Sequence, residues 1–277
     1  MGYLLYDHGD SRWFTYFKVV EVLGIVTVVF VFCRNELKLG HGLAYSKFTS
    51  ESRKEIKQVS SRVGMLIIYT PAALIGAWSF LGNLIANRVW DGNIGSSSVG
   101  TIKVLILSAA LFLHFLKRDL ETLFLHHYSG KAGFSSALTI SGVYFVTAAN
   151  LNLVQQKSED FAPPALDLTR VGIGFFIIGV LGNLYHHILL RGLRKGGDTK
   201  YVIPEGGLFG VFVAPHYIFE IVTFLGVTLI SQTFMAVSTL VIVVMYLGCR
   251  SYSTKQWYLK KIDRFPKNRC AMIPYVF

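Results

Sequence analysis

The chain has 277 residues, of which 52% are hydrophobic and only 16% charged, and its mean hydropathy is +0.48. A soluble globular domain carries roughly 25% charged residues, so one water-soluble core of this size cannot bury the apolar surface. A disordered or nucleic-acid-binding chain is excluded as well. The formal net charge is nevertheless +11, and three cysteines are too few for a secreted disulfide scaffold. The composition therefore predicts an integral membrane protein whose positive charge is unevenly distributed.

Long uncharged runs predict the membrane-crossing helices, because a hydrocarbon layer about 30 Å thick needs about 20 apolar residues of helix. Five such runs come first in the chain, and the run that follows them, 206–249, contains one charged residue, Glu220. A single helix of that length would measure roughly 66 Å, so we expect it to fold back near residues 231–233. The sequence thus predicts an all-α integral membrane protein with seven transmembrane helices, forming a single domain over 1–277. In chain order, the first five spans are expected at 16–33, 63–87, 101–116, 132–156 and 171–190.

The positive charges gather in alternate loops, which sets the expected orientation. Four segments, 34–62, 117–131, 191–205 and 250–277, together hold 21 Lys and Arg against 8 Asp and Glu. The segments on the opposite side hold 6 residues of each sign. The positive-inside rule therefore predicts a cytosolic C-terminus and an N-terminus on the other side. Acidic residues precede the first apolar run, so we expect an uncleaved anchor helix rather than a signal peptide.

Ionisable side chains inside an apolar span are costly, so each one is a candidate functional residue. Glu220 is the strongest candidate, because this lone carboxylate shares one helical face with His216 and Tyr217. Asn183 and His187 also share a face, which suits either helix packing or a ligand. Most of these polar positions fall toward the basic ends of the helices. They predict a polar cavity that opens to the cytosol.

The sequence contains no motif for metal, nucleotide-loop or transport chemistry. His186 and His187 are adjacent and point about 100° apart on a helix, which is a poor arrangement for one metal ion. The histidine pair at 126–127 falls in a loop and is expected to be interfacial. A Gly-rich phosphate loop, a Gly-x-Ser-x-Gly elbow and repeats with broken helices are all missing. We therefore expect no metal and no nucleic acid; the expected partners are the lipid bilayer and a hydrophobic lipid substrate.

Four motifs follow one another in the C-terminal region 180–277. They are NLYHHILLRGLR at 183–194, YVIPEGGLF at 201–209, PHYIFE at 215–220 and WYLKKIDRFPKNR at 257–269. In this order they resemble the steroid 5α-reductase family, which also holds polyprenol reductases and very-long-chain enoyl-CoA reductases. The seven-span prediction fits the fold of that family. The resemblance also implies a location in the endoplasmic reticulum membrane, with the active site facing the cytosol.

The resemblance implies reduction of a carbon–carbon double bond conjugated to a carbonyl, with NADPH as the cofactor. Hydride goes to the β carbon and a proton to the α carbon. Tyr217 stands at the place of the acid tyrosine of the enoyl-CoA reductases, so Tyr217 and Glu220 are the expected catalytic residues; a structural tyrosine is the alternative for Tyr217. Arginines suit the cofactor phosphates, which they bind bidentately. The positions that match cofactor-binding residues of the family are Asn183, Arg194, Tyr201, His216, Glu220, Arg250, Tyr258 and Arg269.

The middle of the chain bears on the substrate. The stretch KRDLETLF at 117–124 resembles the enoyl-CoA reductases, and the substrate pocket is expected to include His114, Phe115 and Arg118. Residues 68–72 contain no counterpart of the Gln-Glu pair with which animal steroid reductases hold the steroid ketone. The first expected substrate is therefore a trans-2-enoyl-CoA. The alternatives are a 3-oxo-Δ4-steroid or a polyprenol and, from another class of protein, an inactive membrane scaffold that binds lipid.

Overall fold

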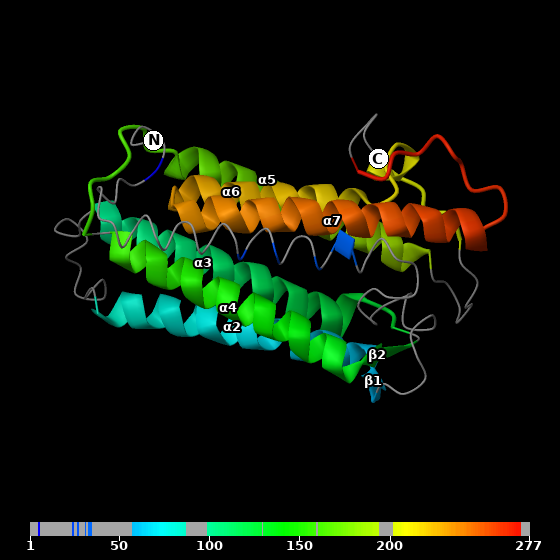
Figure 1. Cartoon of the computed structure of the whole chain (residues 1–277), viewed down its shortest axis with the longest axis horizontal. Helices are drawn as coiled ribbons and strands as arrows, with labels where there is room; N and C mark the ends of the chain where they lie inside the picture. Colours follow the sequence, from blue (N-terminus) through cyan, green and yellow to red (C-terminus); the bar gives the residue numbers. More distant parts are fainter. Residues whose placement is uncertain are drawn as a thin grey trace.

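The computed structural model describes residues 57–86, 99–128, 130–158, 160–193 and 202–272, with a few single positions before residue 35. These residues are mostly helical, and their long helices run along one axis of the molecule (Figure 1). Two short helical segments, η4 (Glu121–Leu125) and η5 (Gly207–Gly210), lie near the site described below. The long helices are α2 (Ser61–Ala86), α3 (Val99–Leu120), α4 (Phe134–Ser158), α5 (Thr169–Gly192), α6 (Pro215–Ser231) and α7 (Phe234–Lys261).

The helices pack in two groups that share α3 and α4. One apolar cluster joins α2, α3 and α4 through side chains that include Ile68, Phe115 and Ile140. A second joins α3 and α4 to α5, α6 and α7, with Leu107 and Val227 among its buried members. In Figure 1, α5, α6 and α7 accordingly lie together along one side of the bundle, and α2 and α4 lie along the other. Polar side chains on α3 can therefore contact both groups.

Glycines allow α5 and α6 to approach closely. A Cβ atom on Gly172 of α5 would lie 2.7 Å from the backbone nitrogen of Ile230 and 2.8 Å from the carbonyl oxygen of Gly226. Small residues at such contacts are typical of membrane helices, whose association depends on close packing. The α6 helix begins at Pro215, which suits the first helical turn because the N–H groups there have no helical partner.

Four of the described helices are long and apolar enough to cross a membrane. They are Ser61–Ile85, Phe134–Ser158, Thr169–Gly192 and Phe234–Lys261. Among the other predicted spans, the run 101–116 lies within α3, and α6 is a shorter apolar helix of 17 residues. The predicted reversal near residues 231–233 is confirmed, because α6 ends at Ser231 and α7 begins at Phe234. The predicted span at 16–33 falls almost entirely outside the described residues, so the count of seven stays a prediction.

Among the described residues, the departures from the all-α prediction are one short antiparallel ladder and an isolated bridge between Phe212 and Cys270. Strand β1 (Gln58–Ser60) pairs with β2 (Lys131–Gly133), and Val59 lies opposite Ala132. Three-residue strands are too short to show a sequence alternation, so hydropathy could not reveal them. The ladder joins the starts of α2 and α4 at the end of the bundle that also holds the end of α7 (Figure 1). The described parts of the segments that the charge pattern assigns to one side of the membrane thus lie at one end of the bundle.

Candidate active site

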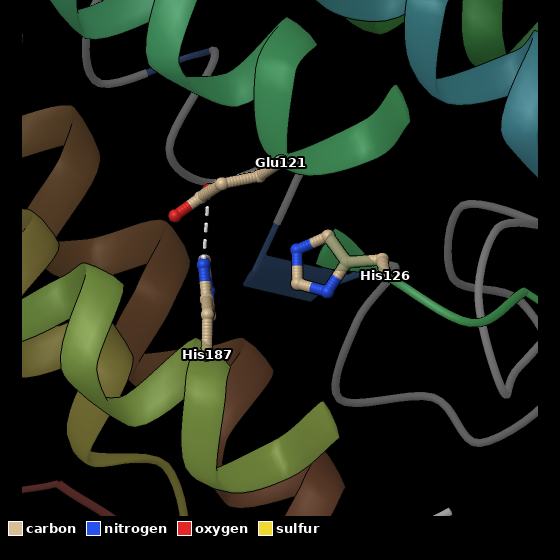
Figure 2. Close-up of side chains that lie close together, drawn as sticks. All are labelled: Glu121, His126 and His187. Atoms are coloured by element: carbon tan, nitrogen blue, oxygen red, sulfur yellow. Dashed lines mark hydrogen bonds and ion pairs between the residues drawn. The ribbon is translucent and has the colours of Figure 1, made fainter. Parts of the chain in front are cut away.

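A buried ion cluster forms where α3 continues into η4. Glu121, only 4% exposed, receives Lys117 Nζ at 2.8 Å and Arg118 Nη1 at 3.3 Å on its two carboxylate oxygens. Residues three and four apart share a helical face, so the local sequence already sets these two contacts. The third partner comes from α5: His187 Nδ1 lies 3.0 Å from Glu121 Oε2. Figure 2 shows the two side chains facing each other, with the ring of His126 beside them.

Asn183 connects this cluster to α6. Its Oδ1 accepts a hydrogen bond from Lys117 Nζ at 2.5 Å. Its Nδ2 donates to the carbonyl oxygen of His216 at 2.9 Å and to Glu220 Oε2 at 3.1 Å. The other Glu220 oxygen lies 3.3 Å from His114 Nε2 on α3. A continuous series of polar contacts therefore runs from Glu121 to His114, and we call it the polar chain.

Arg118 extends the polar chain to α2. Its Nη2 donates to the hydroxyl of Tyr69 at 2.6 Å, and its guanidinium carbon lies 4.8 Å from the centroid of that ring. Its Nη1 also lies 3.4 Å from both ring nitrogens of His187. Tyr69 was not singled out in the sequence, because a tyrosine in an apolar span is equally at home in a packed core. Only the packing of α2 on α3 identifies it as part of the site.

The charges at this end of the bundle are strongly perturbed. Burial alone would raise the pKa of Glu121, but the hydrogen bond and charge of His187 and the charges of Arg118 and Lys117 hold it well below its usual value. Burial and the charges of His187 and Arg118 lower the pKa of His126 to about 3. Glu121 is therefore ionised at neutral pH and balances the cations, whereas the ring of His126 is neutral.

Glu121, His126 and His187 are of the residue types that hold metal ions. One ligand atom from each lies within 4.8 Å of the others (Figure 2). However, Lys117 and Arg118 already occupy the carboxylate, and a divalent cation would add two charges beside them in a buried, low-dielectric place. The electrostatics here favour an anionic or neutral polar ligand over a metal.

Ten of the twelve predicted site residues fall into three sets. The polar chain brings together Asn183, His216 and Glu220 with the expected substrate-pocket residues His114 and Arg118. A second set lies at the far end of α7 and in the tail, and a third lies outside the described residues. The second set comprises Arg250, Tyr258 and Arg269; the third comprises Arg194 and Tyr201.

Two residues of the second set, Tyr258 and Arg269, lie against the ring of Phe265. The ring of Tyr258 lies 5.1 Å from that of Phe265, and the guanidinium carbon of Arg269 lies 5.5 Å from the same ring. Arg269 Nη1 also donates to the carbonyl oxygen of Pro204 at 2.7 Å. Arg250 is buried within α7 at 2% exposure. Arg269 therefore holds the loop that precedes α6 through its hydrogen bond to Pro204.

That loop, residues 202–214, contacts both α5 and the segment that follows α7. The N–H of Leu208 donates to His186 Nε2 at 3.2 Å, so His186 holds the loop against α5. At its other end, the N–H of Val213 donates to the carbonyl oxygen of Cys270 at 2.8 Å. The loop therefore ties α5, which carries Asn183, to the tail that carries Arg269.

The remaining two predicted residues have clear positions. Tyr217 lies in the first turn of α6, partly buried, with its ring centroid 4.3 Å from that of His216. Phe115 is buried on α3, and its ring lies 4.9 Å from His114 and 5.5 Å from Tyr144. Tyr217 is thus beside the polar chain, whereas Phe115 belongs to the apolar cluster of α2, α3 and α4.

Comparison with known proteins identifies the family. A family model described as 3-oxo-5-alpha-steroid 4-dehydrogenase matches residues 131–277, more than half of the chain. The chain belongs to this family. The resemblance drawn from its motifs is thereby confirmed, and the matched region contains α5, α6, α7 and the tail.

Individual relatives are similar over shorter stretches. Human 3-oxo-5-alpha-steroid 4-dehydrogenase 1 is 36% identical over 107 residues, which is 39% of this chain and 41% of that protein. The type 2 protein of Macaca fascicularis is 35% identical over 107 residues, 39% of this chain and 42% of its own. The type 1 protein of Rattus norvegicus is 28% identical over 186 residues, 65% of this chain and 71% of its own. The chain thus spans about two fifths of the length of the first relatives.

The names of these relatives bear on the expected substrate. All three are named for 3-oxo-5-alpha-steroids, and none for an enoyl-CoA. They are dehydrogenases, which are oxidoreductases. The first expectation, a trans-2-enoyl-CoA, therefore gains no specific support from them, and the steroid alternative agrees with them better.

Proposed function

We propose that the chain is a membrane-embedded reductase that uses NADPH to reduce a carbon–carbon double bond conjugated to a carbonyl in a lipid. The observation that carries this proposal is the polar chain. It joins Asn183 and Glu220, two positions that match cofactor-binding residues of the family, to the cations Lys117 and Arg118. A purely structural bundle would gain little from so many buried charges, because their desolvation is costly.

The chemistry of the side chains fits a nicotinamide cofactor. The carbonyl oxygen of the Asn183 amide and the Glu220 carboxylate are acceptors, as the N–H groups of the carboxamide and the hydroxyls of the ribose of such a cofactor require. The arginines of the second set suit its phosphates. When bound, NADPH supplies the hydride. The residues that would hold it are Asn183, His216, Glu220, Arg250, Tyr258 and Arg269, joined by Arg194 and Tyr201.

Tyr217 is the proposed acid for the α carbon. It lies in the first turn of α6, on one face with Glu220 and beside His216. A positioned phenol can protonate the carbon, and neighbouring cations ease the loss of its proton. Tyr217 then takes up a new proton from the cytosol. The basic end of the bundle is proposed to face the cytosol, with the bundle in the endoplasmic reticulum membrane.

The first candidate substrate is a 3-oxo-Δ4-steroid, in line with the relatives. A trans-2-enoyl-CoA is the second candidate, because the stretch 117–124 that resembles enoyl-CoA reductases supplies Lys117, Arg118 and Glu121 to the buried cluster. Both substrates carry a double bond conjugated to a carbonyl, so the same chemistry serves either one.

Turnover by the purified chain tests the proposal. Wild-type protein in lipid nanodiscs is mixed with NADPH and, separately, a 3-oxo-Δ4-steroid, a trans-2-enoyl-CoA and a polyprenal, and NADPH oxidation and the reduced product are measured. We expect turnover with the steroid enone and none with its saturated counterpart. Tyr217→Phe should lower kcat by about 100-fold or more with NADPH affinity unchanged. If the wild type neither binds NADPH nor reduces any of the three, the inactive lipid-binding scaffold replaces the enzyme.

A further inference from the structure

Tyr69 and Arg118 lie where an apolar and a polar environment meet. Tyr69 is 6% exposed and belongs to the apolar cluster of α2, α3 and α4. Arg118, whose Nη2 donates to the Tyr69 hydroxyl at 2.6 Å, belongs to the polar chain through Glu121 and His187. A lipid whose reactive end is a carbonyl needs this combination of surroundings.

One N–H group of the Arg118 guanidinium makes no hydrogen bond with the described residues. Nη1 faces Glu121 and His187, and Nη2 faces Tyr69. The Nε–H is buried and has no hydrogen-bond partner in the part of the chain that the structure describes. Buried donors without a partner are rare and call for an explanation. Because Nε and Nη2 point along the same edge of the planar guanidinium, an oxygen bound by Nε–H would lie next to the Tyr69 hydroxyl.

The Tyr69 hydroxyl is suited to donate toward that oxygen. A phenol can accept one hydrogen bond and donate another at the same time, so the bond from Arg118 strengthens Tyr69 as a donor. Its ring is held by stacking on Tyr144, with centroids 5.9 Å apart and planes at 13°. The neighbouring hydroxyl, on Thr70, instead donates to Asp119 at 3.2 Å.

We propose that the Tyr69 O–H and the Arg118 Nε–H together bind the carbonyl oxygen of the substrate. The inference rests on the proposed function. When a hydride, with its electron pair, reaches the β carbon, the π electrons of the double bond shift and the carbonyl oxygen becomes an enolate oxyanion. The two donors stabilise that charge, and no covalent bond to Tyr69 is made or broken. A proton delivered from Tyr217 to the α carbon then restores the carbonyl, so the substrate gains one hydride and one proton.

Donors aimed at a developing oxyanion act on the transition state more than on the bound substrate. Removal of the Tyr69 hydroxyl is therefore expected to lower kcat much more than it changes KM. Phe keeps the ring that stacks on Tyr144, so Tyr69→Phe tests the hydroxyl alone. Tyr144→Phe is the matched control, because it removes a hydroxyl from the other ring of the same stack.

The experiment uses the full chain in nanodiscs with a 3-oxo-Δ4-steroid carrying ¹³C at its carbonyl. For Tyr69→Phe we expect kcat to fall about 100-fold, with the dissociation constant of NADPH unchanged. Infrared difference spectra of the bound steroid, recorded without cofactor, should show a lowered carbonyl stretch in the wild type and a higher one in Tyr69→Phe. Tyr144→Phe should behave like the wild type in both measurements.

The outcomes separate the two proposals. Turnover by the wild type with equal kcat and equal carbonyl frequency in Tyr69→Phe overturns the role of Tyr69 and leaves the reductase standing. Equal losses in Tyr69→Phe and Tyr144→Phe also overturn it, because they would reflect ring packing. A wild type that reduces no enone and leaves the carbonyl frequency of the steroid unshifted overturns both the pair and the reductase.

Discussion

Glu121 organises more of the site than its place in the sequence indicates. It is the carboxylate on which Lys117, Arg118 and His187 converge. Lys117 in turn reaches Asn183, so the position of that amide depends on Glu121 through one intermediate. The sequence marked Glu220 as the strongest candidate acid because it is isolated in an apolar run, whereas Glu121 follows Lys117 and Arg118 beyond the end of a predicted span and was ranked below it.

Replacing Glu121 by Gln should destabilise the protein substantially. The change leaves buried cations without their counter-charge, and breaking a buried ion pair in this way costs roughly 3–5 kcal/mol. Thermal unfolding of the purified protein measures the effect. Asp119→Asn is the matched control two residues away, because Asp119 accepts a hydrogen bond from the neutral Thr70 hydroxyl. Asp119→Asn should lower the free energy of unfolding by about 1 kcal/mol. Equal losses of stability in the two variants would contradict the role of Glu121.

The difference in stability between the wild type and Glu121→Gln should depend on pH. The folded-state pKa of Glu121 lies below its ordinary value of 4.5, so the unfolded chain takes up a proton first as the pH falls. The stability contributed by the ionised carboxylate is therefore fully present above about pH 4.5 and lost as the pH falls below it. The difference in unfolding temperature between wild type and Glu121→Gln should be constant at neutral pH and narrow in acid. A gap that widened in acid would show that the cluster is held together differently.

At the scale of elements, the close contact between α5 and α6 positions the site. It sets Asn183 on α5 against the start of α6, where the His216 carbonyl and Glu220 accept its two N–H groups. The contact depends on glycines such as Gly172, where a Cβ atom would collide with the backbone of α6. A helix spacing wider by a methyl group would break the hydrogen bonds of Asn183.

Gly172→Ala is therefore expected to cost about 1–3 kcal/mol, as overpacking does. The matched control is Gly174→Ala on the same helix, where a Cβ atom would meet nothing within 4 Å. Because alanine is more favourable than glycine inside a helix, Gly174→Ala should be neutral or should stabilise the protein by roughly 0.5–1 kcal/mol. Thermal unfolding in one detergent measures both variants. Similar stability of the two would mean that α5 and α6 do not pack as closely as described.

At the scale of the whole molecule, the two ends of the helix bundle differ in charge, as the distribution of Lys and Arg along the sequence predicts. The end with β1, β2, η4 and the end of α7 holds the described parts of the segments rich in Lys and Arg. The ion pair of Lys103 with Asp167, at 3.1 Å, lies at the opposite end and joins the start of α3 to the segment before α5. Gln232, in the reversal between α6 and α7, accepts from Lys103 Nζ at 3.2 Å and completes this contact. The polar chain lies toward the basic end.

Seven spans would place the two ends of this chain on opposite sides of the membrane. A tag added after residue 277 should be reached by antibody when only the plasma membrane is permeabilised, and a tag before residue 1 should not. Full permeabilisation should expose both tags, which controls for hidden epitopes. Exposure of both tags under selective conditions would mean an even number of spans and would contradict the predicted topology.

The sequence by itself determined the membrane class, the helical runs that became α2 to α7, the reversal near residues 231–233 and the family. These follow from hydropathy, length and short motifs, which are properties of neighbouring residues. Only the tertiary structure decided which polar side chains meet. Glu121 and His187 are 66 residues apart, as are Lys117 and Asn183, and Tyr69 and Arg118 are 49 apart. Such pairs depend on how close the helices approach and which faces they turn to each other, and that is set by steric fit between distant segments rather than by any local pattern.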